Sequence, residues 1–549
     1  MKKKITALVL AAAIVISAFT FPAFANEDVS DTGMQVLYTV LDKVVNGLVG
    51  GIAAMIKTPN WTKKSDYETP SSFLQGNTKS EFIQEPAENA KWSLGYSDAT
   101  LLTGKEVGSD GDYYVGGSLT VGKKLATEQW DDQRVRTVAI SDGRGITIFA
   151  VLDAYGMANT DVRAIREQFL NQYKGNQKIT AINISALHQH SCVDSFGMNG
   201  DLVSALFTSS FKNLFGIKVP SGQNEEYMEN LYSVTIDTMN KAIEDMKEGD
   251  LYYGKVDVDS FIRDKRDPEV YDKYLNRFRF DPADGSKDTW FTEGAIHCVG
   301  NGAGNTELTG DYPLYMQRYI AENYDANFIY IQGAELAISD NDKTRTDSYE
   351  GDCAKYMNEN IENWKNEESF NEKTAEIRAY GELLAKKLGA VTEEKKLDPI
   401  LNIAYKEFNI EIDNNILVLA AKGGLLVNNV VKSGLGKYEI VTEVGYAEFG
   451  KDIAVAIIPG ELAPEIAFGG AENVLNCWNK ETWDYEAFSD VTKGRELVVF
   501  GLTNDQVGYL LTNNNWHSIF TENEEVVSAG KMAGATVAKN FIELYNSVK

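Results

Sequence analysis

The amino-acid sequence predicts an α/β fold of the mixed α+β type, a large single domain whose mixed sheets are covered by helices. Short apolar runs typical of buried strands alternate along the chain with segments of helical period. This alternation favours α/β or α+β over an all-β sandwich. The chain has 549 residues, of which 43% are hydrophobic and 24% are charged. Such a composition excludes a disordered chain, a collagen-like repeat and a small disulfide scaffold.

The first segment, residues 1–25, has the order of a secretory signal peptide. Three lysines precede an apolar run, and Ala23-Phe24-Ala25 forms a small-x-small cleavage site before Asn26. We therefore expect cleavage after Ala25 and a secreted, extracellular protein. No cysteine follows this run to carry a lipid anchor, and no later stretch has the roughly 18 uninterrupted apolar residues of a spanning helix.

Residues 34–57 form an apolar segment that predicts a helix. Its valine, leucine and isoleucine side chains recur every four residues, at Val36, Val40, Val44, Leu48 and Ile52. The stripe could make peripheral contact with a membrane surface. Alternatively it could dock on the domain, which is the more common role of an apolar helical stripe.

The polar residues 58–91 contain three prolines and predict a linker or an irregular wrap. Residues 26–91 thus form an N-terminal extension, and residues 92–549 form the globular domain. The expected strands of this domain are 135–141, 146–152, 179–187, 328–331, 416–420, 453–458 and 497–500. The expected helices are 161–173, 225–247, 314–323, 371–388 and 524–545.

The charge of the chain excludes one class of partner. Lysine and arginine number 53 against 80 aspartate and glutamate, for a formal net charge of -27. Nucleic acid is not expected to bind, because neutralising phosphates requires a basic face. Four cysteines are too few to crosslink a chain of this length, although one or two disulfides of undetermined pairing are possible in an oxidising compartment.

Histidine is scarce in the chain, so its placement is informative. His188 and His190 end an apolar run, and a spacing of two on an extended chain puts both imidazoles on one face, where they could bind a metal. His297 ends a second run, before a glycine-rich loop. A polar strand end explains the first pair equally, and a hydrogen-bonded core histidine explains His297.

Two further residues could join the histidines. Glu461 follows a buried-looking strand and a Pro-Gly turn, and Tyr509 lies in the segment GLTNDQVGY. Taken singly, Glu461 could be a helix N-terminal carboxylate and Tyr509 a packed aromatic. As a set, imidazole nitrogen and carboxylate oxygen are ligands of Zn²⁺, and a catalytic zinc keeps one position for water, whose pKa falls to about 7.

Five segments resemble, in order and spacing, those of the neutral/alkaline non-lysosomal ceramidases, over about residues 92–545. They are similar to the family's His-Thr-His-Ser strand end, its Arg-Ser-Pro-x-x-Tyr segment, its Ala-Val-His block, its Pro-Gly-Glu turn and its Gly-Leu-x-Asn-x-Tyr segment. Here they read NISALHQHS (183–191), RDPEVY (266–271), the block from RFRF to TGDY (277–312), IIPGEL (457–462) and GLTNDQVGYLLT (501–512).

The resemblance implies a zinc-dependent hydrolase that cleaves the amide of N-acylsphingosine into fatty acid and sphingosine. It implies Zn²⁺ ligands at His188, His297, Glu461 and Tyr509, with His190 and Arg266 lining the reaction centre. A zinc-activated water would attack the amide carbon, Tyr509 or Arg266 would stabilise the oxyanion, and His190 would pass a proton to the leaving amine.

The sequence departs from the family at three places. The family's Gly-Asp-Val-Ser-Pro-Asn, which carries a serine implicated in catalysis, reads LAISDN here, so that Ser339 is kept but its neighbours change. The family's Ser-Gly-Pro-Gly-Gly reads SCVDS at 191–195. The immunoglobulin-like C-terminal domain of better known members is not expected. The metal centre is therefore better supported than the substrate.

We accordingly predict a secreted zinc amidohydrolase acting on ceramide or a related N-acyl lipid. One alternative is a zinc hydrolase of the same fold that cleaves a different amide, such as an N-acyl amino acid or a cell-wall amide. Another is a catalytically silent binding or surface protein.

Overall fold

A nine-stranded mixed sheet forms the centre of the computed structural model, which describes residues 32–108, 113–117, 124–198, 222–302, 304–339, 349–367, 369–471, 481–519 and 524–549. The predicted signal peptide lies outside these residues. β11 and β9 run parallel, as do β4 and β5, and the other pairs are antiparallel. The strands follow the order β11 (Asn327–Gln332), β9 (Thr289–Gly294), β8 (Tyr274–Pro282), β6 (Lys247–Asp257), β1 (Trp92–Thr100), β3 (Arg134–Ser141), β4 (Ile146–Leu152) and β5 (Ile179–Ala186), with β13 (Lys395–Leu397) beside β6.

A second mixed sheet has five strands. Its order is β14 (Leu401–Glu411), β16 (Lys437–Phe449), β17 (Ile453–Ile457) and β19 (Glu496–Phe500), with β15 (Val430–Gly434) also beside β16. Three two-stranded ribbons complete the pairing: β2 (Glu128–Gln129) with β10 (Glu307–Leu308), β7 (Arg263–Asp264) with β12 (Ile338–Ser339), and β18 (Glu461–Leu462) with β20 (Tyr509–Leu510).

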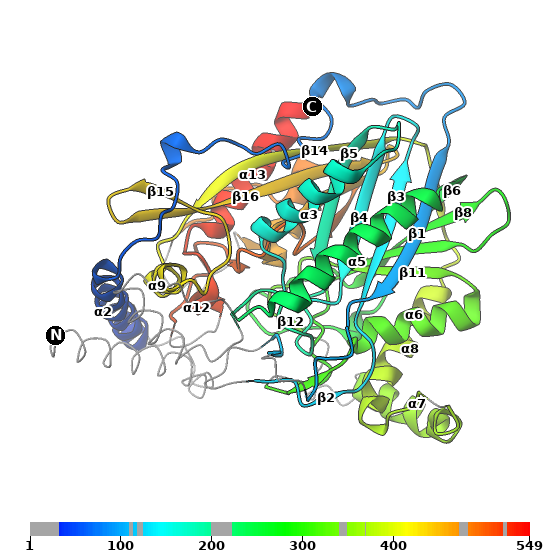
Figure 1. Cartoon of the computed structure of the whole chain (residues 1–549), viewed down its shortest axis with the longest axis horizontal. Coiled ribbons are helices and arrows are strands. Elements are labelled where there is room, and N and C mark those ends of the chain that lie inside the picture. Colours follow the sequence, from blue (N-terminus) through cyan, green and yellow to red (C-terminus); the bar gives the residue numbers. More distant parts are fainter. Residues whose placement is uncertain are drawn as a thin grey trace.

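Helices surround these sheets (Figure 1). The longer ones are α2 (Thr32–Met55), α3 (Asn159–Gln172), α5 (Glu225–Glu244), α6 (Asp311–Tyr324), α7 (Tyr349–Trp364), α8 (Ala375–Gly389), α9 (Asn415–Gly423) and α13 (Ala533–Val548). The short ones are α10 (Pro464–Phe468), α11 (Phe488–Val491) and α12 (Glu524–Val527), and the 3₁₀ turns are η2 (Lys64–Asp66), η3 (Lys79–Glu81), η4 (Asp259–Phe261) and η5 (Glu372–Thr374).

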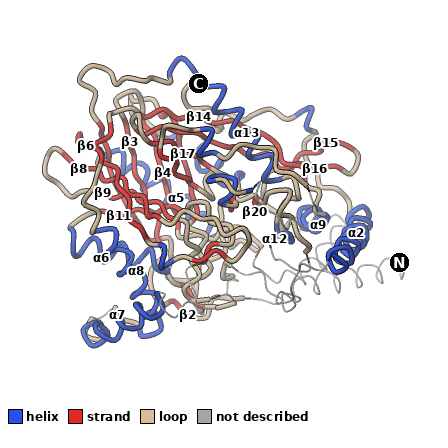
Figure 2. The backbone as a smooth tube through the Cα atoms, turned by 180° about the vertical axis from the view of Figure 1, so that it is seen from behind, coloured by secondary structure: helices blue, strands red, loops and turns tan. Residues whose placement is uncertain are grey.

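Side-chain alternation along the strands explains the layers. In β4, Ile148 and Ala150 pack against α3 and α5, whereas Phe149 points into the core shared by the two sheets. There its ring lies 6.3 Å from Phe449 and 5.6 Å from Phe500 of the second sheet. The far face of that sheet is covered by α13, as Figure 2 shows from behind. The predicted fold class, mixed sheets covered by helices in one large domain, is confirmed.

One predicted strand is wrong. Residues 416–420 lie in α9, because Asn414 accepts a hydrogen bond from the backbone N–H of Ile416 and Gly424 ends the helix with a φ of 82°. The predicted helices 161–173, 225–247, 314–323, 371–388 and 524–545 are present with shifted bounds, and two of the differences change the assignment of residues. α5 ends at Glu244, so Lys247 already belongs to β6, and the predicted helix 524–545 is divided into α12 and α13.

The predicted helix at 34–57 is present as α2, and it docks on α9 through a face that includes Ile52 alone of the five predicted stripe residues. Val45, Val49 and Ile52 are buried, and the side chain of Asn415 donates to the backbone carbonyl of Asn46 at 2.9 Å. Four stripe residues remain exposed, namely Val36, Val40, Val44 and Leu48. Among the described residues, α2 is the one helix long and apolar enough to cross a bilayer, by length and composition alone.

Candidate metal centre

Four buried side chains converge from segments that each follow a strand. His188 comes after β5, His297 after β9, Glu335 after β11 and Glu461 after β17. One potential ligand atom of each lies within 4.8 Å of those of the other three. Segments far apart in the sequence, and strands of both large sheets, therefore contribute to one cluster.

Backbone carbonyls fix the orientation of the two imidazoles. His188 Nδ1 lies 3.0 Å from the carbonyl oxygen of Tyr155, and His297 Nδ1 lies 2.8 Å from that of Ile338. A carbonyl can only accept, so each Nδ1 carries the proton and each Nε2 presents its lone pair. Both Nε2 atoms face the same Glu461 oxygen, Oε2, at 3.5 Å from His188 and 3.3 Å from His297.

Burial keeps the imidazoles neutral. Burial lowers the pKa of His188 to about 4, although the nearby Glu461 charge opposes this shift. Burial, with the positive charge of Lys265, lowers the pKa of His297 to about 3. Burial also raises the pKa of Glu461, while His188 and hydrogen bonds from Gln506 and Tyr509 act to lower it. Neutral imidazoles are the form that binds a metal ion.

The geometry fits a divalent metal ion. His188 Nε2 and Glu461 Oε2 are buried and have no hydrogen-bond partner in the part of the chain that the structure describes, an arrangement that is unfavourable unless a cation lies between them. Ligand bonds of about 2.1 Å in tetrahedral geometry separate neighbouring ligand atoms by about 3.4 Å. The two distances to Glu461 Oε2, 3.5 and 3.3 Å, match this separation. The set of donors, imidazole nitrogen and carboxylate oxygen, suits zinc.

The His188 backbone is held in an unusual conformation. Its φ is 53°, in the left-handed region, and Ala337 in the turn beyond Glu335 has a φ of 63°. Non-glycine residues in this region store strain and cluster at functional sites. The surrounding hydrogen bonds hold both segments in place: Gln189 N–H donates to the carbonyl of Ala154, and Lys265 N–H donates to that of Ala337.

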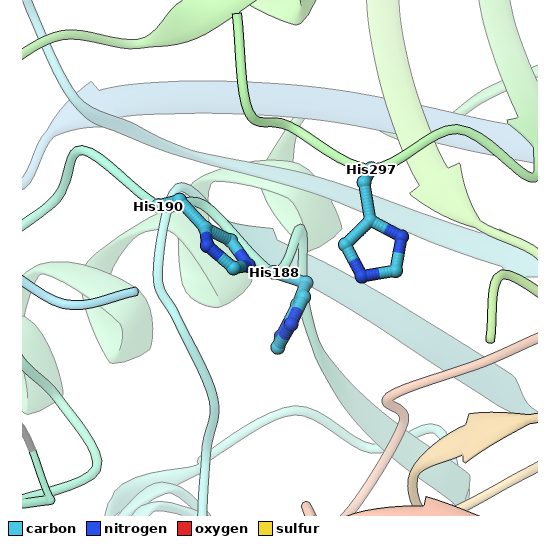
Figure 3. A group of neighbouring side chains, drawn as sticks. All are labelled: His188, His190 and His297. Atoms are coloured by element: carbon cyan, nitrogen blue, oxygen red, sulfur yellow. The ribbon is translucent and has the colours of Figure 1, made fainter. Parts of the chain in front are cut away.

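His190 lies beside the cluster, and the three imidazoles converge (Figure 3). Its ring centroid is 4.7 Å from that of His188 and 5.8 Å from that of His297. Among the described residues, neither ring nitrogen of His190 has a hydrogen-bond partner, although both are buried. Burial lowers the pKa of His190 well below its usual value. A neutral imidazole with both nitrogens available can take or give a proton at this centre.

The other three sequence-predicted residues differ in their contacts. Tyr509 is the register partner of Glu461 in the ribbon of β18 and β20. Ser339 is buried in β12, next to the Ile338 carbonyl that orients His297. Arg266 forms an ion pair with Glu525 at 2.7 Å and donates to the Asn515 carbonyl at 2.5 Å.

Lys265 was not predicted from the sequence as a residue of the centre. Its positive charge adds to the effect of burial and lowers the pKa of both His190 and His297. His517 hydrogen-bonds Asn515 and is not part of the cluster.

Two more residues near the centre were not predicted from the sequence. Glu335 joins the cluster itself, and Gln506 donates to Glu461 Oε1 at 3.2 Å. A carboxylate just after an apolar strand, as at Glu461, was the sequence signal for Glu335.

A small, mostly apolar cavity of about 30 Å³ borders Glu461. Tyr155 stands between the cavity and the imidazoles, with its ring centroid 4.6 Å from that of His188. The aliphatic and aromatic side chains of the cavity wall are those of Phe196, Met198, Leu417, Leu426, Ile440, Val507 and Val527. The carboxylate thus faces apolar surface contributed in part by α9.

No protein-family model matches the chain, and no curated protein matches it in sequence. Among solved structures it is similar to the neutral ceramidase from Pseudomonas aeruginosa, at 13% identity and a TM-score of 0.58, over 83% of this chain and 74% of that one. It is also similar to a ceramidase complexed with C2, at 14% identity and a TM-score of 0.57, over 83% and 75% of the two chains. The chain therefore has a ceramidase-like fold.

Proposed function

We propose that the protein is a secreted, zinc-dependent amidohydrolase that cleaves the amide of ceramide or a related N-acyl lipid. The observation that carries the proposal is the pair of orphaned buried atoms, His188 Nε2 and Glu461 Oε2, spaced as neighbouring zinc ligands. The ceramidase-like fold and the resemblance of the five sequence segments support the same reaction. The sequence of residues 1–25 supports secretion.

His188, His297 and Glu461 would hold the ion, with Tyr509 the further ligand that the sequence resemblance implies. When bound, zinc supplies Lewis-acid polarisation of the amide carbonyl and an activated water. His190 takes up a proton and delivers it to the leaving amine, since both its nitrogens are available. Burial holds the pKa of Tyr509 well above its usual value, so the phenol stays protonated and can donate to the developing oxyanion.

Ser339 and Arg266 have supporting roles in this proposal. The Ser339 hydroxyl positions substrate or donates a hydrogen bond, and the attacking group is water rather than the serine. Arg266 lines the reaction centre as the resemblance implies, and its ion pair with Glu525 fixes the guanidinium.

The exposed stripe of α2 supports peripheral contact with a lipid surface. Val36, Val40, Val44 and Leu48 form one exposed apolar row, which a lipid interface would cover. α2 packs on α9, and Leu417 of α9 lines the cavity beside Glu461. A membrane bound at α2 would therefore lie near the apolar side of the candidate centre.

The central experiment combines metal analysis with turnover. The chain from Asn26 onward is purified, its zinc content is measured, and hydrolysis is followed on fluorogenic ceramide and on an N-acyl amino acid. Zinc with ceramide turnover supports the proposal. Zinc with hydrolysis only of the other amide favours a different substrate, and the absence of both zinc and turnover favours a silent binding protein.

The membrane contact is tested with Val40→Ser and Val44→Ser combined, against Leu435→Ser as the control. Leu435 is a fully exposed apolar residue in the turn between β15 and β16, outside the apolar row of α2. The α2 variant should lose activity on ceramide in liposomes and keep it on detergent-dispersed ceramide, while the control keeps both. Equal losses on the two substrate forms would contradict a lipid-contact role.

A further inference from the structure

Glu335 is a second buried carboxylate at the candidate centre, and none of the sequence segments that indicated zinc includes it. It lies in the turn between β11 and β12 and is fully buried. The turn is attached on both sides of the site. Leu336 N–H donates to the carbonyl of Leu462, beside Glu461, and Ile338 accepts the Nδ1 proton of His297. The backbone thus holds Glu335 between two of the proposed ligands.

Neither carboxylate oxygen of Glu335 has a hydrogen-bond partner among the described residues. The nearest imidazole atom is His297 Nδ1, at 3.7 Å from Glu335 Oε2. Its proton is already donated to the Ile338 carbonyl. A carboxylate that stays ionised when it is buried needs an ion pair, hydrogen bonds or a metal ion. The described residues provide neither an ion pair with a charged side chain nor a hydrogen bond to Glu335.

The position of Glu335 fits the remaining possibility, a bond to a metal ion. Its carboxylate belongs to the group with His188, His297 and Glu461 whose ligand atoms all lie within 4.8 Å of one another. Two neutral imidazoles and two carboxylates carry a total charge of -2, which one divalent cation neutralises. A buried site with no net charge avoids the cost of an uncompensated ion.

We infer that Glu335 is a direct ligand of the divalent metal ion, so that the centre has two imidazoles and two carboxylates. This inference rests on the proposed metal centre and extends its ligand set. Tyr509, whose hydroxyl hydrogen-bonds Glu461, then acts through that carboxylate and through substrate rather than as the essential fourth ligand. Two imidazole nitrogens and two carboxylate oxygens form a donor set that suits Zn²⁺ and related divalent transition-metal ions.

The test measures zinc affinity in the absence of substrate, by competition with a chelator, for wild type, Glu335→Gln and Tyr509→Phe. Glu293→Gln is the matched control, because Glu293 is equally buried in β9, beside the strand that leads to Glu335, but accepts a hydrogen bond from Asn276 at 2.7 Å. We expect Glu335→Gln to weaken zinc binding by at least about tenfold, while Glu293→Gln and Tyr509→Phe stay close to wild type.

Two further measurements make the result independent of folding and of activity. Zinc should raise the melting temperature of wild type more than that of Glu335→Gln, because stabilisation by a ligand follows its affinity. The visible spectrum of the Co²⁺-loaded protein should also change in Glu335→Gln. If that variant does not fold, Glu335→Asp decides, since it retracts the carboxylate by one methylene and should also weaken binding.

Wild-type affinity and an unchanged Co²⁺ spectrum in Glu335→Gln, or in Glu335→Asp when the first does not fold, would overturn the inference. Loss of zinc in Tyr509→Phe but not in Glu335→Gln would also overturn it. A wild type that binds zinc through Glu335 but hydrolyses no lipid amide would instead overturn the proposed function and leave the ligand assignment standing.

Discussion

Acid should destabilise the metal-free protein through the two imidazoles that face Glu461. Burial lowers the pKa of His188 to about 4 and that of His297 to about 3, whereas histidine in an unfolded chain has a pKa of about 6.5. Between these values the unfolded state binds protons that the folded state does not. The free energy of unfolding therefore falls as the pH drops below about 6.5, and this loss continues until the folded pKa is reached.

The width of the pH window gives the expected magnitude. Each pH unit below about 6.5 lowers the free energy of unfolding by about 1.4 kcal/mol for each imidazole. At about pH 5 each imidazole has therefore lowered it by roughly 2 kcal/mol. The buried carboxylates act with the opposite sign. Burial raises the pKa of Glu335 and Glu461, so the stability they contribute is present at low pH and is lost as the pH rises. The histidine effect must therefore be isolated with a variant.

His188→Asn removes one imidazole with little backbone strain, because asparagine tolerates the left-handed conformation of residue 188 better than most residues. The stability advantage of wild type over this variant should shrink by about 2 kcal/mol between about pH 7.5 and about pH 5. Urea unfolding followed by tryptophan fluorescence, with a chelator present, measures both values. An advantage that is the same at the two pH values would refute the reasoning, since it would mean that His188 is protonated equally in both states.

Three further predictions concern the metal and the reaction. His297→Ala should reduce bound zinc from about one ion per chain to nearly none in elemental analysis, while His517→Ala, outside the cluster, should keep it; full zinc in the first variant would remove this site from consideration. Tyr509→Phe should keep the fold, as shown by circular dichroism, and lower kcat by about 10²-fold, because it loses an oxyanion donor; an unchanged kcat would exclude the hydroxyl from the reaction. Ser339→Ala should retain measurable turnover, whereas Glu461→Ala should abolish turnover together with metal binding, and an acyl adduct trapped on Ser339 would make the serine the attacking group.

The sequence predicts strands made of apolar residues well and strands that carry charged side chains poorly. Residues 453–457 are a continuous apolar run and residues 146–152 are apolar except for Thr147, and both are strands of the structure. β14 and β16 were not predicted, because Lys406 and Glu443 interrupt their apolar pattern. Residues 416–420 were assigned to the wrong type of element because a short apolar run does not distinguish strand from helix, and the capping residues outside the run decide.

The candidate centre could be predicted where the residue type is rare. With four histidines in the chain, the positions of His188 and His297 were conspicuous, and the structure brings both together with Glu461. Glu335 follows an apolar strand, as Glu461 does, but it is one of many acidic residues, and this signal alone does not select it. The role proposed for it depends on the absence of a hydrogen-bond partner among the described residues, which only the three-dimensional arrangement reveals.

The division of the ligands between the two large sheets has a consequence for the order of folding. His188 and His297 follow strands of the nine-stranded sheet, while Glu461 follows a strand of the five-stranded sheet. These side chains meet only after the sheets have packed face to face. The proposed binding site therefore depends on contacts between residues far apart in the sequence, and it is absent from partly folded chains. An ion bound there would stabilise the native state more than the folding transition state, and it would act by slowing unfolding rather than by speeding folding.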